Sequence, residues 1–304
     1  MPQSTRSSKA AEIREVVRPV NRLAMNVASC GEGPAMVLLH GFPDHWRVWR
    51  PLMERLADDF TLHADQRGYN LTSRPADVSA YGTEHLVADI AALIASISDE
   101  PVCLVAHDWG ATLAFWLAMQ QPDRLKCVTI LNGAHPYLLQ DAIWDDPRQR
   151  AASQYFETLR SEAFENLVKP DAGESIAAEW FGPELASGRM SRQDYDGYLK
   201  AWRSPGAWEA MLNWYRAAPF IIPPIDAPAP ENRWTHGRDY LIKVPVQVIW
   251  GAKDTVFSSV LVDDLNRYAP CLDVHCLPDA GHVPQRDAPD TCADLIRSFA
   301  ERFL

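Results

Sequence analysis

Residues 102–118, VCLVAHDWGATLAFWLA, decide how the rest of the chain is interpreted. The apolar run 102–106 is typical of a buried strand, and a helical pattern begins at Ala111. Between them, AHDWG at 106–110 has small residues at both ends and an acid in the centre. A sharp turn from strand to helix strains its central residue, and only small neighbours fit beside it. The stretch therefore predicts a strand–turn–helix with Asp108 at the strained position.

Asp108 occupies the position that a nucleophilic serine takes in the G-x-S-x-G nucleophile elbow. An aspartate is already ionised at neutral pH, so it needs no base before it attacks. It can attack an sp³ carbon directly and form an alkyl ester. The helix N-terminus at 109–111 favours the anion. The structural alternative is an N-cap aspartate at an ordinary turn.

The composition is ordinary for a globular protein. The chain has 304 residues, enough for one large α/β domain with an insertion. A net charge of -11 argues against nucleic acid or an anionic membrane as a partner. The apolar runs are too short for a membrane span or a signal peptide. Six cysteines without a C-x-x-C pair indicate a reducing compartment, so we expect a cytoplasmic protein.

Strand patterns and helix patterns alternate along most of the chain. We expect strands at 12–18, 23–29, 35–40, 60–65, 102–106, 126–131, 241–250 and 272–277. Besides the helix after the elbow, we expect helices at 46–57, 84–97, 258–267 and 290–303. This alternation predicts an α/β fold, with a mostly parallel eight-stranded sheet flanked by helices.

The alternation stops between the sixth and seventh of these strands. There the sequence is helical and aromatic, and prolines at 219–230 interrupt it before the next strand. The sequence therefore predicts a catalytic domain formed by 1–135 and 239–304. A helical lid domain is expected at 136–238. Residues 1–11 are polar and are expected to be loosely ordered.

An acid and a base should follow the nucleophile in chain order. Asp254 comes just after the strand at 241–250, and His282 comes after the strand at 272–277. The carboxyl ends of parallel strands are where such sheets place their sites. Neither residue alone is strong evidence for a catalytic site, because loop aspartates often cap helices and the chain holds nine histidines. Together with Asp108 they match the order nucleophile, acid, base.

The turn HGFP at 40–43 follows the strand at 35–40. In this arrangement the turn supplies one backbone N–H to an oxyanion hole, and the residue after the nucleophile supplies another. We assign these two donors to Phe42 and Trp109. The alternative is a tight turn without a catalytic role, in which Pro43 is cis.

These stretches together resemble an α/β-hydrolase of the epoxide hydrolase group. HGFPDHWRVWR at 40–50 resembles the group's H-G-F-P-[DE]-x-W-x-x-W-R stretch, and DQRGY at 65–69 resembles its D-x-R-G-Y loop. HDWG at 107–110 is similar to its elbow, and Gly281-His282 to its base loop. The resemblance covers nearly all of the expected catalytic domain and is weaker in the lid. It implies the α/β-hydrolase fold.

The resemblance also implies two lid tyrosines that hydrogen-bond to the epoxide oxygen. Tyr215 matches the second of them, within the stretch NWYR at 213–216. Tyr155 matches the first, at the head of YFETLR at 155–160, with fewer matching neighbours. The alternative for both is simple packing on an aromatic helix.

The implied reaction has two steps and needs no metal or organic cofactor. Tyr155 and Tyr215 polarise the oxygen of a small apolar epoxide while Asp108 attacks a ring carbon. His282, oriented by Asp254, then deprotonates a water that attacks the ester carbonyl. The two N–H donors hold the oxyanion, and a vicinal diol leaves.

Two other classes of protein stay open at this point: a dehalogenase, of either of two kinds, and a binding protein without activity. A haloacetate dehalogenase would carry arginines at and just after the elbow, where this chain has Trp109 and Thr112. A haloalkane dehalogenase would use the indole N–H of Trp109 and a second halide donor, which Phe42 does not offer but a lid tryptophan could. A silent relative that binds an apolar ligand under the lid is the third class. Diol formation, halide release, or tight binding without turnover would separate the three.

Overall fold

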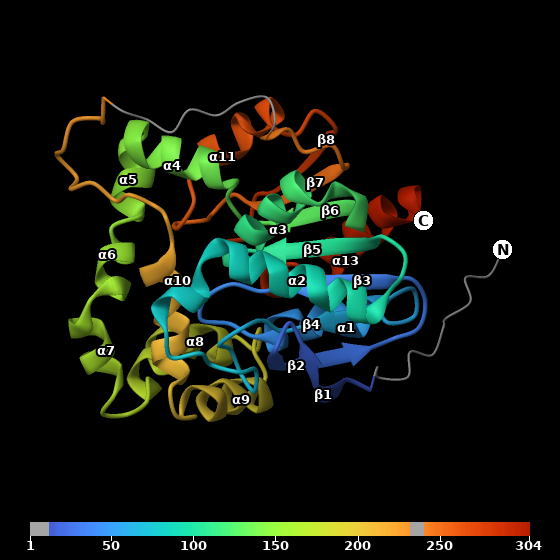
Figure 1. Cartoon of the computed structure of the whole chain (residues 1–304), viewed down its shortest axis with the longest axis horizontal. Helices are drawn as coiled ribbons and strands as arrows, with labels where there is room; N and C mark the ends of the chain where they lie inside the picture. The colour runs from blue at the N-terminus through green and yellow to red at the C-terminus, as the bar shows by residue number, and fades with distance from the viewer. Residues whose placement is uncertain (1–11, 232–239) are drawn as a thin grey trace.

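A computed structural model describes residues 12–231 and 240–304, and Figure 1 shows their arrangement. An eight-stranded sheet runs through the centre in the order β1-β2-β4-β3-β5-β6-β7-β8. β2 runs antiparallel to β1 and to β4, and the other neighbouring strands are parallel. The expected eight-stranded, mostly parallel sheet is confirmed. The expectation for residues 1–11 and the expected domain boundary at 238/239 lie outside the described residues.

The strands are short, and those at the centre of the sheet are buried on both faces. β5 is buried along its whole length, as a parallel strand covered by helices on both sides should be. The strands are β1 (Arg14–Val20), β2 (Leu23–Cys30), β3 (Ala35–Leu39), β4 (Thr61–Ala64), β5 (Val102–His107), β6 (Leu125–Leu131), β7 (Val246–Gly251) and β8 (Leu272–Leu277).

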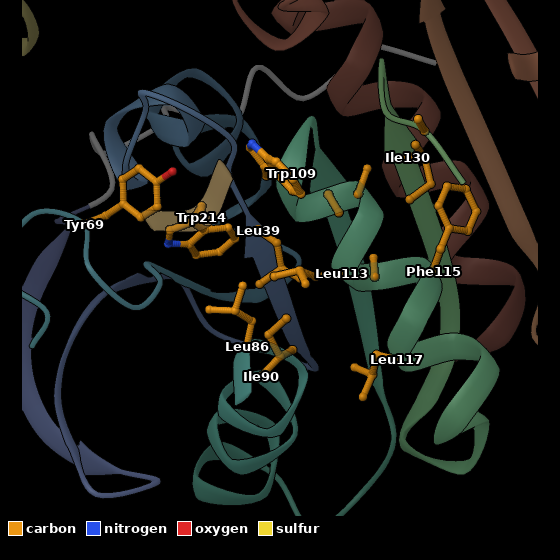
Figure 2. Close-up of a cluster of buried hydrophobic side chains, with 14 of the residues drawn as sticks. Leu39, Tyr69, Leu86, Ile90, Trp109, Leu113, Phe115, Leu117, Ile130 and Trp214 are labelled. Carbon is orange, nitrogen blue, oxygen red and sulfur yellow. The ribbon is translucent and has the colours of Figure 1, made fainter. Parts of the chain in front are cut away.

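Two hydrophobic clusters lie on opposite faces of the sheet. One is built with α1 (Arg50–Leu56) and α13 (Pro289–Ala300), and the other with α2 (Thr83–Ile97) and α3 (Trp109–Gln120). Figure 2 shows the second cluster, where Leu113 of α3 and Leu86 of α2 lie close to Leu39 of β3. Packing on both faces fixes the strand ends, and with them the residues that follow each strand.

A series of helices lies between β6 and β7 in sequence. Figure 1 shows most of them at the end of the sheet toward which β5 points. They are α4 (Pro136–Asp145), α5 (Pro147–Ala152), α6 (Tyr155–Arg160), α7 (Glu162–Val168), α8 (Glu174–Ala186), α9 (Arg192–Trp202) and α10 (Ala207–Ala217). Among the described residues, no helix is both long enough and apolar enough to cross a bilayer.

Some expected elements are shorter than the sequence pattern indicated. The strand expected at 241–250 begins only at Val246, because Pro245 before it has no N–H to donate to the sheet. The helix expected at 46–57 starts as a 3-10 turn, Trp46–Trp49, and becomes α-helical at Arg50, with proline in its first turn. The helix expected at 258–267 divides into α11 (Val260–Asp263) and a 3-10 turn, Leu265–Arg267.

Candidate active site

Asp108 lies at the sharp turn between β5 and α3. Its backbone angles, φ 52° and ψ -122°, are unusual for a residue with a side chain and are a sign of local strain. A methyl group at Gly110 would lie 2.2 Å from the carbonyl oxygen of Leu39, so this neighbour has to be small. The strand–turn–helix that AHDWG predicts is therefore confirmed.

Two backbone N–H groups stabilise the carboxylate of Asp108. The N–H of Phe42 donates to Oδ1 at 2.9 Å, and the N–H of Trp109 helps to lower the pKa of the carboxylate. The turn before Phe42 approaches so closely that a Cβ at Gly41 would lie 2.0 Å from Oδ1. The Phe42–Pro43 peptide bond is cis. Both residues expected to supply oxyanion donors thus face the same carboxylate.

His282 lies between two carboxylates. Its Nδ1 is 3.0 Å from Oδ2 of Asp254, and its Nε2 is 3.6 Å from Oδ2 of Asp108. The backbone carbonyl of His282 accepts a hydrogen bond from Nε2 of His107 at 2.8 Å, which ties the loop to β5. The loops after β5, β7 and β8 therefore bring together the three residues that the sequence placed in the order nucleophile, acid, base.

The three side chains shift one another's protonation. Burial alone would lower the pKa of His282, but the charges of Asp254 and Asp108 and the hydrogen bond with Asp254 raise it to about 10. Burial alone would raise the pKa of Asp108, but His282 and the Trp109 N–H hold it below its usual value. The pKa of Asp254 is lowered in the same way, against burial, by His282 and Asn132. At neutral pH the site holds an imidazolium between two carboxylates.

Asn132, which directly follows β6, was not among the expected site residues. Its Nδ2 donates to Oδ2 of Asp254 at 2.6 Å, and its Oδ1 accepts from the N–H of Gly251 at 2.6 Å. The N–H groups of Val256 and Phe257 donate to the other oxygen of Asp254, at 2.7 and 3.1 Å. Asn132 thus helps to orient the acid. Its place at the carboxyl end of a strand was the available signal.

Tyr155 and Tyr215 approach the same place from two helices. Tyr155 is the first residue of α6, Tyr215 lies near the end of α10, and their ring centroids are 5.9 Å apart. Burial raises the pKa of each phenol well above its usual value, and the charge of Asp108 raises both further. Both hydroxyls are therefore protonated and available as donors.

A small apolar cavity adjoins the carboxylate. Its volume is about 10 Å³, room for about one water molecule. Most of the side chains around it are aromatic or aliphatic: it is lined by Asp108, Trp109, Thr112, Leu139, Tyr155, Phe156, Phe220 and Phe257. An apolar ligand fits this lining better than a charged one.

A larger hollow of about 550 Å³ lies near the start of the described chain, and none of the residues discussed above lines it. Its charged lining is mostly acidic: Glu12, Arg14, Glu32, Glu54 and Asp58. Size alone would favour this hollow as a binding site. We favour the smaller cavity, because it alone of the two is lined by the carboxylate of Asp108 and by Tyr155.

The features expected of a dehalogenase are weak in this structure. The indole of Trp109 lies against the ring of Tyr215 and helps to lower the pKa of its phenol, and the side chain of Phe42 has no polar atom. The hydroxyl of Thr112 donates to the carbonyl of Ala134 at 3.1 Å, at a position where haloacetate chemistry would want an arginine. A halide beside Asp108 would therefore have to share the indole of Trp109 with Tyr215.

Several known proteins have sequences similar to that of this chain. A sequence profile of the alpha/beta hydrolase fold matches residues 34–289. The AB hydrolase superfamily protein YfhM of Bacillus subtilis is 29% identical over 283 residues, which cover 92% of this chain and 95% of that protein. Epoxide hydrolase 3 of Xenopus tropicalis is 29% identical over 285 residues, which cover 89% of this chain and 72% of that protein.

Solved structures agree with the sequence matches. An epoxide hydrolase from Bacillus megaterium in complex with an inhibitor superposes with a TM-score of 0.82 at 27% identity, covering 95% of this chain and 100% of that one. A structure described as one of the novel epoxide hydrolases from metagenomes of hot environments superposes with a TM-score of 0.83 at 30% identity, covering 95% and 98%.

Proposed function

This chain belongs to the α/β-hydrolase fold family, and on that premise we propose that it is an epoxide hydrolase. It would convert an apolar epoxide and water into a vicinal diol through an ester on Asp108. The observation that carries the proposal is that one ionised carboxylate lies beside His282 and close enough to two buried phenols to raise their pKa values. The similar proteins named epoxide hydrolase support the same substrate class.

In the first step, Oδ2 of Asp108 attacks a ring carbon of the epoxide. The carbon–oxygen bond breaks, and its electron pair moves to the epoxide oxygen. Tyr155 and Tyr215 hydrogen-bond to that oxygen, which stabilises the charge where it develops. Their high pKa values keep the phenols protonated until this moment.

The proton on His282 compensates for the proton that the epoxide oxygen takes up when the ring opens. Esterification removes the negative charge of Asp108, one of the two that raise the pKa of His282 to about 10. The pKa of His282 therefore falls in the ester. It releases a proton that balances the one the alkoxide takes up. The neutral imidazole left behind is the base that the second step needs.

In the second step, His282 takes a proton from water as the water attacks the ester carbonyl. We propose that the carbonyl oxygen is Oδ1, because the Phe42 N–H already donates to it at 2.9 Å. With the Trp109 N–H, this donor would stabilise the oxyanion. Collapse breaks the ester bond, and the second proton of the attacking water, now on the new carboxyl group, passes to the departing oxygen. Asp108 and protonated His282 are restored, as at the start.

We also propose that residues 136–238 are a lid domain, inserted in a catalytic domain of residues 1–135 and 239–304. The support is that α4 to α10 follow one another between β6 and β7. They carry Tyr155 and Tyr215 to the carboxylate and provide Phe156 for the cavity wall. A cytoplasmic location, expected from the cysteines, stays a prediction.

A substrate panel tests the assignment. Small aryl and alkyl epoxides are incubated beside chloroalkanes, bromoalkanes and fluoroacetate, and both diol and halide are measured. Asp108→Ala is the matched control for background hydrolysis. Diol formation that depends on Asp108 supports the proposal. Halide release without diol would assign the site to a dehalogenase, and tight binding without turnover would make the chain a binding protein.

A further inference from the structure

A buried cation joins the loop of His282 to the helices beyond the sheet. Arg286 lies on α12 (Pro284–Asp287), and its side chain is 4% exposed. Its guanidinium donates to the carboxylate of Asp44, to Oε2 of Glu184 at 3.0 Å and to the hydroxyl of Tyr198 at 2.8 Å. The hydroxyl of Tyr198 in turn donates to Oδ1 of Asp44 at 2.7 Å. One guanidinium therefore contacts three separate parts of the chain.

Two of these partners come from the helices between β6 and β7. Glu184 lies on α8 and Tyr198 on α9. The ring of Phe181, also on α8, lies 5.2 Å from the guanidinium carbon and provides an aromatic face for the cation. The third partner, Asp44, ends the turn at 41–44, which we call the oxyanion loop. The indole N–H of Trp202 on α9 donates to the carbonyl of Pro43 in the same loop at 3.2 Å.

On its other side, Arg286 belongs to the segment 281–287, which we call the base loop. The N–H of Gly281 donates to Oδ2 of Asp287 at 2.8 Å, so the two ends of this segment are tied to each other. The N–H of Arg286 donates to the carbonyl of Val283, the residue after His282. The loop is thus a compact unit, and a displacement of α12 would displace His282 with it.

Arg286, Asp44, Glu184 and Tyr198 form one buried cluster, and loss of its cation would change the local structure. The carboxylate of Asp44 is 4% exposed and that of Glu184 is 16% exposed, and buried carboxylates need a partner. Without the guanidinium these two carboxylates would face each other across the same space. Repulsion and hydration would then separate α8, the oxyanion loop and the base loop. Both groups that the second step needs lie on those two loops.

We propose that Arg286 is a positioning residue for hydrolysis of the ester. It holds the base loop against the oxyanion loop and α8. In this way it keeps His282 and the Phe42 N–H at the correct distances from Asp108. The inference rests on the proposed function. Attack by Asp108 on the epoxide needs no base, so the first step depends on Arg286 much less than the second.

Single-turnover kinetics separate the two steps. Rapid quenching followed by intact-protein mass spectrometry measures how fast the ester on Asp108 forms and how fast it disappears. In Arg286→Met we expect ester hydrolysis to slow about 100-fold, the cost of a displaced catalytic group. Ester formation should change by less than about threefold, so the ester accumulates. Arg286→Lys keeps the charge but not the planar fork, and should restore hydrolysis in part.

The control is Arg50→Met. Arg50 of α1 pairs with Asp194 of α9 at 2.8 Å, so it also ties α9 to the catalytic domain, through an ion pair that involves no residue of the base loop. It should leave the ratio of the two rate constants unchanged. If Arg286→Met lowers both rate constants by the same factor, or neither, the positioning role is refuted and the cluster only stabilises the fold.

Two further outcomes are also decisive. If Arg286→Met does not fold, Arg286→Lys and Tyr198→Phe carry the test, because each keeps a cation and weakens the cluster. Both must slow ester hydrolysis more than ester formation, and equal slowing refutes the proposal. If the unsubstituted enzyme forms neither ester nor diol, the proposed function itself fails, whatever Arg286 does.

Discussion

His282 approaches Asp108 at 3.6 Å, through Nε2 and Oδ2, within ion-pair range but longer than an ordinary hydrogen bond. Its other ring nitrogen lies 3.0 Å from Oδ2 of Asp254. The hydrogen bond with Asp254 therefore orients the imidazole, and Asp108 interacts with it mainly through charge. Oδ2 of Asp108 is therefore not blocked by a short hydrogen bond. The same geometry gives the histidine two negative neighbours, which determine when it can act as a base.

Asp108→Ala should abolish turnover and leave the fold intact, because a smaller side chain fits the crowded turn. The loss of a nucleophile should lower kcat by more than about 1,000-fold. Steady-state diol formation measures the loss, and circular dichroism checks the fold. Activity within about tenfold of the unsubstituted enzyme would exclude an ester on Asp108.

Tyr155→Phe and Tyr215→Phe each remove one donor to the epoxide oxygen, and the double variant removes both. We expect each single change to slow ester formation by about 10-fold or more, and the double change to stop it almost completely. Rapid-quench mass spectrometry measures this step directly. Tyr195→Phe is a matched control, because Tyr195 is also buried on a helix but does not line the cavity. Efficient ring opening by the double variant would remove both tyrosines from the mechanism.

In His282→Gln the ester should form and then persist, because only the second step needs a base. Intact-protein mass spectrometry should show the mass of one substrate added, on the peptide that contains Asp108. In the unsubstituted enzyme, a single turnover in ¹⁸O-water should leave the label on Asp108 and give unlabelled diol. Labelled diol in the first turnover, with no adduct in the variant, would mean that water attacks the epoxide directly.

The charge state of His282 should also appear in the pH dependence of stability. A group whose pKa is raised by folding stabilises the protein fully below its unfolded pKa. For His282 that contribution should be complete below about pH 6.5 and should be lost as the pH rises through about 10. The free energy of unfolding of the unsubstituted protein, minus that of His282→Gln, should therefore shrink between pH values of about 6 and about 10. Denaturant titrations at both ends measure it; a constant difference would show that the histidine is not held charged.

The parts of the site that sequence reasoning located are those fixed by local chain geometry. Asp108 stands in a pattern of small residues that only a sharp strand-to-helix turn explains, and Asp254 and His282 each follow a strand. Asn132 was missed because its partner Asp254 is 122 positions away. Arg286 was missed for the same reason, because its contact with Asp44 spans 242 positions. Periodicity describes one segment at a time and cannot show which side chains meet across the fold.

The ends of the strands were also predicted unevenly from the sequence. β8 begins and ends where the apolar pattern does, because nothing within it interrupts hydrogen bonding to β7. β7 is shorter than its apolar pattern, because Pro245 cannot donate to a neighbouring strand. Hydrophobicity records burial, whereas a strand also needs N–H groups that can pair.

The tight aromatic packing around Asp108 has a kinetic consequence. A space of about 10 Å³ admits a water molecule but not an epoxide with a side chain, so we expect substrate to bind to a more open form of the site. The apparent dissociation constant is then the intrinsic one divided by the fraction of open molecules. Substitutions that loosen Phe156 or Phe220 should therefore tighten apparent binding of bulky substrates, even though they remove contacts. The affinity for substrate would then depend on how often the aromatic side chains around the cavity move apart, as well as on the contacts that they make with bound substrate.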